Sequence, residues 1–212
     1  MADLQKLYDA VLNGDAKTAV AVTKEALDEN MDPLLLISGT MVPAMDEVGK
    51  RYEAEEYFVP ELLLSARAMK GSLQLLRPLL IERGAKPAGT VAIGTVKGDL
   101  HDIGKNLVAS LLEGGGFEVI DLGADVPPEK FIEAIREKGA QIVCLSALLT
   151  VTMPSMKTTI EALKQAGVRD QVKVLVGGAP VTRQYAEEIG ADGYGENASN
   201  AVALARRLCG VQ

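Results

Sequence analysis

Residues 90–106 read TVAIGTVKGDLHDIGKN, and they carry the clearest indication of the fold. Its first seven residues form an apolar run with several β-branched side chains and no polar alternation, which is typical of a strand buried on both faces. A helical stretch follows from about Ile103 to Gly115. A buried strand that leads into a helix is the repeating unit of proteins in which parallel strands alternate with helices.

The same pattern repeats to the end of the chain. Further strands are predicted in FEVIDLG (117–123), AQIVCLSAL (140–148), VKVLVGG (172–178) and a short segment at 192–194. Helices are predicted at 127–138, 153–165, 183–189 and 197–208. Five strand–helix units of this length favour an α/β fold with a flavodoxin-like, Rossmann-like parallel sheet, strand order 2-1-3-4-5 and helices on both faces.

The first part of the chain follows a helical period instead. Asp15 is a candidate cap for a second helix, Asp32 and Pro33 are typical of the start of a third, and Pro60 opens a fourth. Apolar stripes such as Leu62, Ala66, Met69, Leu73 and Leu76 predict that these four short helices form a bundle, with its methionines in the core. The polar segment ERGAKPAG (82–89) is expected to be the linker, so the predicted domains span residues 1–88 and 89–212.

Composition excludes several classes of protein. The 212 residues carry a formal net charge of −7, which is unsuited to contacts with nucleic-acid phosphates. The sequence has no apolar run long enough to cross a membrane and no secretory signal at its N-terminus, and its two cysteines, Cys144 and Cys209, are far apart. These features favour a cytoplasmic protein. With one histidine and two distant cysteines, a zinc site built of His and Cys is excluded.

Three loops are expected to meet where ligands bind in such sheets, beyond the carboxyl ends of the strands. They are residues 97–106, 146–150 and 177–180. The first loop holds His101, with Asp99 two residues before it as a candidate acceptor for one ring N–H. One imidazole cannot hold a bare metal ion, but it can be the axial ligand of a metal inside a macrocycle, and Gly98 and Gly104 would admit such a flat group. A surface or capping role for His101 remains an alternative at this point.

Together the three loops resemble the cobalamin-binding signature Asp-x-His-x-x-Gly, Ser-x-Leu, Gly-Gly. Here it reads Asp99 to Gly104, then Ser146 to Leu148, then Gly177 and Gly178. Residues 45–49 (MDEVG), 57–62 (YFVPEL) and 65–67 (SAR) are similar to the helical cap of cobalamin-dependent methionine synthase and of methylotrophic corrinoid proteins. The resemblance covers nearly the whole chain and is closest to the free-standing, methyltransferase cognate corrinoid proteins of methanogens and acetogens.

The resemblance implies a cobalamin or related corrinoid cofactor with His101 as the lower ligand to cobalt, in place of the cofactor's own benzimidazole. It also implies that Asp99 hydrogen-bonds His101 and that Thr152, where methionine synthase has serine, completes the relay. Phe58 would shield the upper face of the corrin, although a hydrophobic staple ahead of Pro60 is an equal alternative. The remaining implied cofactor-binding positions are Gly98, Asp102, Ile103, Gly104, Ser146, Leu148, Thr150, Gly177, Gly178 and Tyr194, with Gly193 and Asn197 at the far end of the slot for the nucleotide tail.

The implied function is that of a methyl carrier in one-carbon metabolism. Co(I) would accept a methyl group from a substrate:corrinoid methyltransferase, and methyl-Co(III) would pass it to a second methyltransferase that uses tetrahydrofolate or coenzyme M. The chain would be one subunit of a multi-component methyltransferase system, with a reductive activase as a further partner and a hinge at residues 84–89. A small subunit of an adenosylcobalamin mutase, a cobalamin sensor and a flavodoxin-like module without corrinoid are the alternatives. The sequence does not select among methylamine, methanol, betaine and methoxyaromatic donors.

Overall fold

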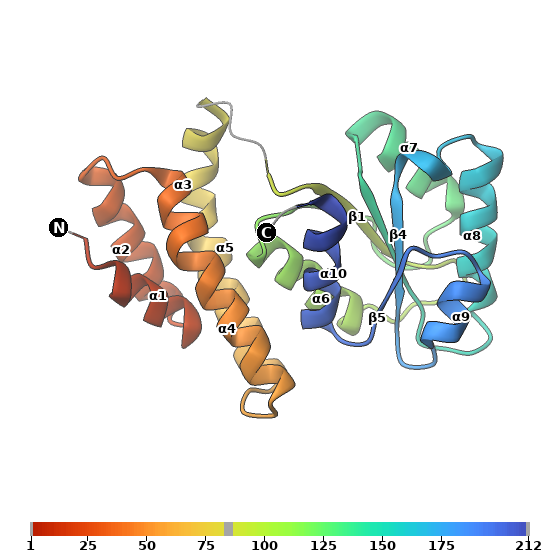
Figure 1. The fold of residues 1–212 in the computed structure, drawn as a ribbon, viewed down its shortest axis with the longest axis horizontal. Coiled ribbons are helices and arrows are strands. Elements are labelled where there is room, and N and C mark those ends of the chain that lie inside the picture. Colours follow the sequence, from red (N-terminus) through yellow and green to blue (C-terminus); the bar gives the residue numbers. More distant parts are fainter. Residues whose placement is uncertain (1, 83–86, 211–212) are drawn as a thin grey trace. The chain divides into compact units, whose positions relative to one another are not determined.

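The computed structural model describes residues 2–82 and 87–210, drawn as a ribbon in Figure 1. The chain divides into two compact units, one of residues Met1–Pro87 with Glu113–Gly116 and one of Ala88–Leu112 with Phe117–Gln212. The expected linker, residues 82–89, includes residues 83–86, which lie outside the described residues.

The helical unit begins with α1 (Leu4–Leu12), α2 (Ala16–Asp28) and α3 (Pro33–Leu36). Each starts at an aspartate whose side chain accepts a hydrogen bond from a backbone N–H of the first turn: Asp3, Asp15 and Asp32. A π-helical turn, η1 (Ile37–Met41), leads directly into α4 (Val42–Glu53), and α5 (Val59–Glu82) completes the unit. The capping predictions at Asp15 and Asp32 are confirmed.

Two features of this unit differ from the sequence prediction. The third predicted helix is not regular, because the π turn inserts extra residues between α3 and α4. Leu36 and Met41, five residues apart, are both fully buried, and the wider turn keeps them on the same side of the helix. The fourth helix, α5, is 24 residues long rather than short. Met41, Met45 and Met69 are buried, as expected for core methionines.

The second unit is a parallel sheet. Its elements are β1 (Thr90–Thr95), α6 (Ile103–Gly114), β2 (Glu118–Asp121), α7 (Pro128–Lys138), β3 (Ile142–Ser146), α8 (Pro154–Gln165), the 3₁₀ turn η2 (Arg169–Gln171), β4 (Lys173–Gly177), α9 (Arg183–Glu188), β5 (Gly193–Gly195) and α10 (Ala198–Cys209). The strand order is β2-β1-β3-β4-β5, and all neighbouring pairs are parallel. The predicted α/β class and strand order are confirmed.

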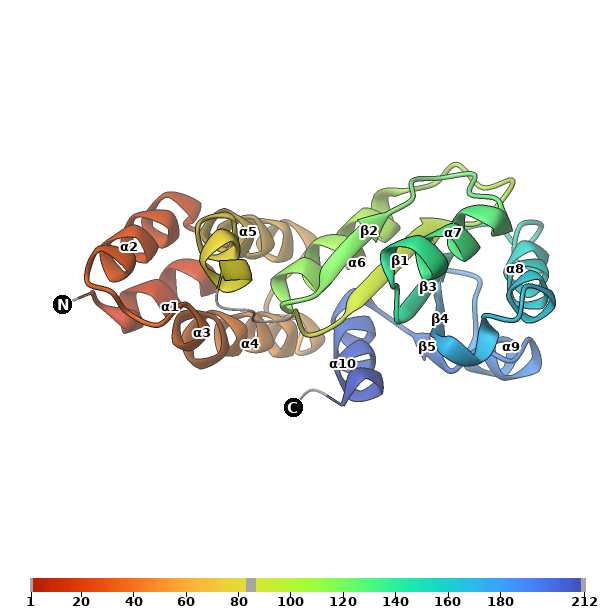
Figure 2. The same ribbon diagram turned by 90° about the horizontal axis from the view of Figure 1, so that it is seen from above.

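Helices cover both faces of this sheet (Figure 2). Val91, Ile93 and Cys144 pack with residues of α6 and α10 in one cluster, whereas their strand neighbours Ala92 and Val143 pack with residues of α7, α8 and α9 in the other. Burial on both faces explains why the strands read as continuous apolar runs. Among residues 2–82 and 87–210, no helix combines the length and apolar character that a membrane span requires.

The strand register brings the ligand-binding loops together. Thr95 pairs with Ser146, Ser146 pairs with Gly177, and Gly177 pairs with Gly195. These residues end β1, β3, β4 and β5 at one edge of the sheet. The loops that follow β1, β3 and β4 are the three that were predicted to meet at the ligand site. They therefore start from neighbouring positions in space.

Candidate functional site

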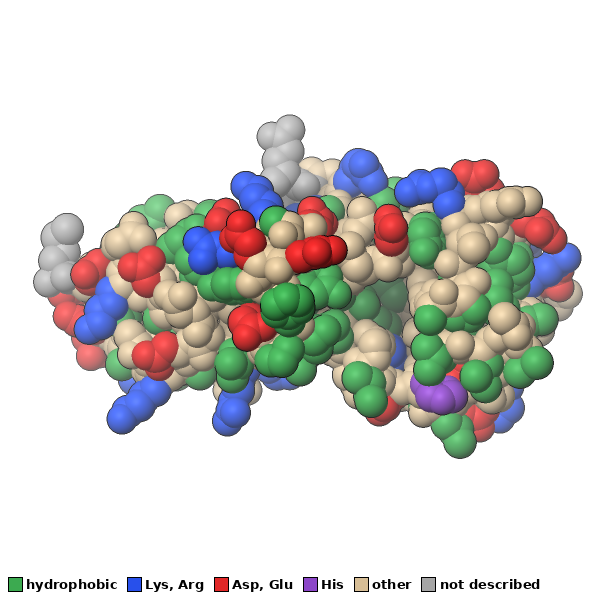
Figure 3. All heavy atoms as spheres, turned by 90° about the horizontal axis from the view of Figure 1, so that it is seen from below, with side chains coloured by type: hydrophobic (Ala, Val, Ile, Leu, Met, Phe, Trp, Pro, Cys, Tyr) green, Lys and Arg blue, Asp and Glu red, His purple; other side chains and the backbone are tan. Residues whose placement is uncertain are grey.

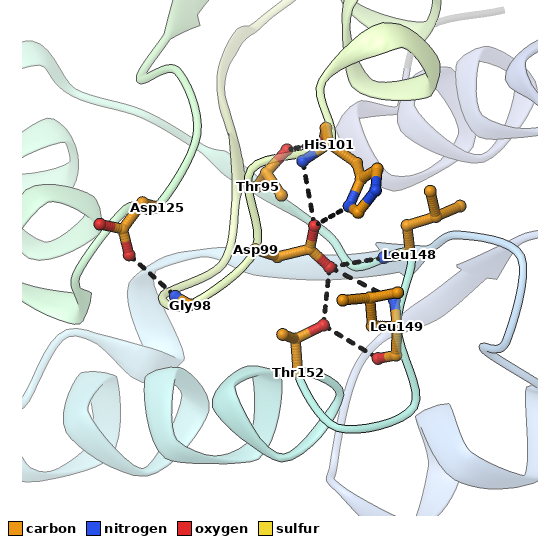
Figure 4. Close-up of polar contacts among 8 residues, drawn as sticks. All are labelled: Thr95, Gly98, Asp99, His101, Asp125, Leu148, Leu149 and Thr152. Carbon is orange, nitrogen blue, oxygen red and sulfur yellow. Dashed lines mark hydrogen bonds and ion pairs between the residues drawn. The ribbon is translucent and has the colours of Figure 1, made fainter.

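A buried carboxylate joins two of these loops (Figure 4). Asp99 Oδ1 accepts hydrogen bonds from the backbone N–H of His101 at 3.0 Å and faces His101 Nδ1 at 2.8 Å. Asp99 Oδ2 accepts from Thr152 Oγ1 at 2.6 Å and from the backbone N–H groups of Leu148 and Leu149 at 2.8 and 3.3 Å. The predicted hydrogen bonds from Asp99 to His101 and to Thr152 are therefore present.

These contacts fix the charge of Asp99. Burial acts to raise the pKa of this carboxyl, but hydrogen bonds from Thr152, Leu148 and His101 outweigh it and hold the pKa of Asp99 well below its ordinary value of 3.8. An ionised carboxylate can only accept, so the proton of the His101–Asp99 contact lies on Nδ1. With the proton of a neutral imidazole on Nδ1, the lone pair of Nε2 is free to bind a metal. The side chain of His101 is 50% exposed.

The backbone around His101 is held as well. Thr95 Oγ1, at the end of β1, donates a hydrogen bond to the carbonyl oxygen of His101 at 2.8 Å. The N–H of Asp99 donates to the carbonyl oxygen of Val96 at 3.1 Å, which closes the turn that leaves the strand. The imidazole thus projects from a loop whose backbone is tied to the sheet on one side and to the β3–α8 loop on the other.

A cavity of about 650 Å³ opens beside His101. It lies against the ends of β1, β3, β4 and β5 on the side of the sheet that α6 and α10 cover, and its walls are mostly apolar. Of the residues predicted to bind a cofactor, those that line it are His101, Asp102, Ile103, Gly104, Ser146, Leu148, Gly177, Gly178, Tyr194 and Asn197. The structure therefore brings most of the predicted positions to one cavity.

The other predicted residues lie elsewhere. Asp99 and Thr152 stand behind the imidazole and do not line the cavity, and Gly98 belongs to the turn before them. Thr150 is exposed in the β3–α8 loop and does not line the cavity either. Phe58, in the helical unit, directly precedes α5 and is 62% exposed, which is more than a packed hydrophobic staple shows. Its backbone N–H donates to Glu61 Oε2 at 2.9 Å.

Gly178 shows why this site needs glycine. Its φ of +130° is a backbone conformation that side chains rarely adopt, and an added Cβ would lie 1.9 Å from the carbonyl oxygen of Ala147. At Gly177, an added Cβ would lie 3.0 Å from the carbonyl oxygen of Gly195. The glycine pair thus lets the chain leaving β4 pass close to the neighbouring strand ends, so that the cavity beside them stays open.

The sequence analysis missed part of the cavity wall. Ile93, Cys144 and Leu175 occupy paired positions on β1, β3 and β4 and all line the cavity. Their side chains face the α6 and α10 side of the sheet, so the alternation along each strand was the signal that identifies them. Burial raises the pKa of Cys144 to about 12, so this thiol is neutral in the wall.

Apolar side chains surround the exposed imidazole. Figure 3 shows the histidine in purple at the surface, with hydrophobic side chains in green beside it. Large hydrophobic residues exposed on the same loops and on the first turn of α6 are Leu100, Ile103, Leu148, Leu149 and Val151. An exposed apolar patch of this kind is typical of a binding site. Within residues 2–82 and 87–210, no group of three or more His, Cys, Asp or Glu is placed to hold a metal ion.

These features fit a corrinoid. The group brings four equatorial nitrogen ligands of its own, so the protein needs to offer one free imidazole nitrogen, and His101 offers Nε2. The apolar patch around His101 suits the broad corrin ring, and the adjoining cavity suits the nucleotide tail of the cofactor. The fit rests on this donor set and on the space that Gly177 and Gly178 keep open.

Comparison with known families agrees with this geometry. Residues 89–203 match a family described as B12 binding domain, and residues 3–77 match a second family of the same description. The two matches cover both units. Fold, site and family matches together define a B12-binding protein of two parts.

Sequence identity to individual relatives shows to which group of B12-binding proteins the chain belongs. The chain is 45% identical to the trimethylamine corrinoid protein of Methanosarcina barkeri over 98% of this chain and 97% of that one, and 44% identical to the dimethylamine corrinoid protein of the same organism over 97% and 96%. The chain therefore belongs to the family of methyltransferase cognate corrinoid proteins. It also matches the crystal structure of the methanol:cobalamin methyltransferase complex of M. barkeri, with a TM-score of 0.85, 29% identity and coverage of 99% of this chain and 80% of that one.

Proposed function

We propose that this chain is a methyl carrier that binds a corrinoid through His101. When bound, the corrinoid supplies a cobalt ion that can accept a methyl group and release it again. The observation that carries the proposal is the Asp99–His101 hydrogen bond at 2.8 Å, with the free ring nitrogen beside a cavity that suits the nucleotide tail. The relatives named above favour this function over a mutase subunit or a cobalamin sensor.

Asp99 orients the imidazole in this proposal. A carboxylate that accepts the second N–H of a histidine ligand fixes its tautomer and raises its basicity. Thr152 Oγ1 and the N–H groups of Leu148 and Leu149 hold the carboxylate from behind, so that it cannot turn away from the ring. The chain thus keeps one proton at His101 Nδ1 and would offer Nε2 to the cobalt ion.

The chain works with partners in this proposal. The structural match to a methyltransferase complex supports a substrate:corrinoid methyltransferase as the donor-side partner. Methylated amines are the proposed donor class, because two matched relatives are named for trimethylamine and dimethylamine; identities of 45% and 44% do not separate the two donors. A second methyltransferase, with tetrahydrofolate or coenzyme M as acceptor, and a reductive activase complete the proposed set.

The two units have separate roles in the proposal. Residues 89–212 form the corrinoid-binding domain, and residues 1–88 form a cap that shields the upper face of the corrin with Phe58. Because a cap that protects a methyl group also blocks its transfer, the two domains must separate during turnover. The expected hinge at residues 84–89 includes residues 84–86, which lie outside the described residues.

Spin resonance tests the ligand. Protein loaded with cobalamin and reduced to the Co(II) state is expected to show splitting from one axial nitrogen, and this splitting should change when histidine alone is labelled with ¹⁵N. Because the chain has one histidine, the label reports on His101 without ambiguity. His101→Ala should abolish the protein-derived splitting and weaken cobalamin binding about 100-fold. A splitting that ignores the label would refute the proposal.

A further inference from the structure

Asp125, in the turn between β2 and α7, has an unusual backbone. Its φ is +54°, in the left-handed region that residues other than glycine seldom occupy. Such a conformation persists only where surrounding contacts enforce it. The contacts made by Asp125 are therefore the place to look for its role.

All of these contacts go to the loop that carries His101. Asp125 Oδ1 accepts a hydrogen bond from the backbone N–H of Gly98 at 2.8 Å, and the N–H of Asp125 donates to the carbonyl oxygen of Asp99 at 2.9 Å. Lys97 Nζ donates to Asp125 Oδ2 at 3.0 Å. The hydrogen bond from Gly98 and the ion pair with Lys97 lower the pKa of Asp125, so it stays ionised at neutral pH.

Two of these hydrogen bonds hold the backbone on either side of the peptide group that joins Gly98 to Asp99, one at the Gly98 N–H and the other at the Asp99 carbonyl oxygen. Gly98 has a φ of +87°, so the chain turns sharply here and has no regular hydrogen-bond ladder to fix it. In Figure 4, Asp125 reaches this turn from one side, whereas Leu148, Leu149 and Thr152 hold the Asp99 side chain from the other. The backbone and the carboxylate of Asp99 are thus held by two different loops.

We propose that Asp125 is a positioning residue for the cobalt ligand: it fixes the Gly98–Asp99 backbone so that the Asp99 carboxylate holds His101 in the metal-binding orientation. The inference rests on the proposed function and adds to it a residue outside the binding signature. Asp125 touches neither the cavity nor the imidazole, and it acts through Asp99.

Three substitutions separate the possible causes of an effect. Asp125→Gly accepts the left-handed backbone without strain but removes the acceptor for Gly98. Asp125→Asn keeps an acceptor oxygen and also tolerates this backbone. Lys97→Met removes the ion pair and leaves the contacts with Gly98 and Asp99. Glu133→Gln, which removes an exposed ion pair with Lys130 on α7, is the matched control for loss of a surface carboxylate.

Each variant is loaded with cobalamin and measured in the Co(II) state for binding affinity and for the fraction of molecules with histidine nitrogen splitting. Asp125→Gly is expected to raise the Kd about tenfold and to lower that fraction, while the thermal unfolding of the cofactor-free protein stays within a few degrees of wild type. Asp125→Asn, Lys97→Met and Glu133→Gln are expected to stay within about twofold of wild type.

Two results overturn the inference alone. One is an Asp125→Gly protein with wild-type affinity and wild-type nitrogen splitting. The other is a wild-type, cofactor-free protein whose Gly98 amide exchanges with solvent as fast as an exposed amide, a measurement that needs no variant. Absence of histidine splitting in the wild type is a different result, because it removes the proposed function and the inference falls with it.

Discussion

The residues proposed to contact the corrinoid in the two units are held in very different ways. In the sheet unit, Asp99 is fully buried and accepts hydrogen bonds from four residues, so that His101 has one favoured orientation. In the helical unit, Phe58 is 62% exposed, and one hydrogen bond is made by its backbone N–H. The imidazole of His101 is therefore preorganised, whereas the side chain of Phe58 has no comparable support within its own unit.

This contrast in support predicts which substitutions act on folding and which act on function. A group held by a buried polar network contributes to stability and to function together, because losing one partner leaves another buried and unsatisfied. An exposed aromatic side chain contributes little to stability, so its substitution isolates function. Substitutions in the sheet unit and at Phe58 are therefore expected to differ in their effect on the free energy of unfolding.

Gly178→Ala should destabilise the sheet unit most. The added Cβ meets the carbonyl oxygen of Ala147 at 1.9 Å, and the φ of +130° adds backbone strain, so we expect a loss of about 3 kcal/mol or more of the free energy of unfolding. Thermal unfolding followed by circular dichroism measures it. Gly104→Ala is the control, because a Cβ there has no neighbour within 4 Å. Equal stability of the two variants would show that the strand ends adjust freely.

Thr152→Val should remove one partner of the network without changing the shape of the side chain. The hydroxyl donates to an ionised carboxylate at 2.6 Å, so we expect a loss of about 2 kcal/mol in urea unfolding at pH 7. Thr159→Val is the matched control on α8: its hydroxyl is also buried but donates to the backbone oxygen of Ser155. Equal losses of unfolding free energy in Thr152→Val and Thr159→Val would contradict this prediction.

Asp99→Asn should change how stability depends on pH. Because the pKa of Asp99 is lower in the folded than in the unfolded chain, the stability it contributes is fully present above about pH 4 and is lost as the pH falls toward the folded pKa. The difference in unfolding free energy between wild type and Asp99→Asn should therefore shrink between pH 5 and pH 2. Urea titrations of cofactor-free protein measure it, and a difference that stays constant contradicts the lowered pKa.

Phe58→Ala should change stability least. With 62% of its surface exposed, Phe58 loses little burial on truncation, and we expect a change within about 0.5 kcal/mol. If Phe58 shields the corrin as proposed, the methylated holoprotein should still lose its methyl group faster in light than the wild type does. Leu63→Ala, an exposed side chain on α5, serves as the control. Identical photolysis rates in all three proteins would remove Phe58 from the site.

The sequence predicts some of these features well and others poorly, for physical reasons. Apolar runs such as TVAIGTV report burial on both faces directly, and the residues joined by the Asp99 network lie in recognisable motifs. The π turn at Ile37–Met41 is not predicted, because the apolar stripe that indicates this helix, from Met41 to Tyr52, begins only where the turn ends. Asp125 is missed because its contacts join two loops that are far apart in the sequence, and no local pattern reveals such contacts.

The thiol in the cavity wall has a consequence for the durability of such a carrier. A protein that handles an activated methyl group risks alkylating its own nucleophiles, and a thiolate is the most reactive of these in ordinary side chains. Because burial raises the pKa of Cys144 to about 12, this thiol is neutral at pH 7. The apolar burial that makes this cavity wall thus also keeps its thiol in the unreactive form.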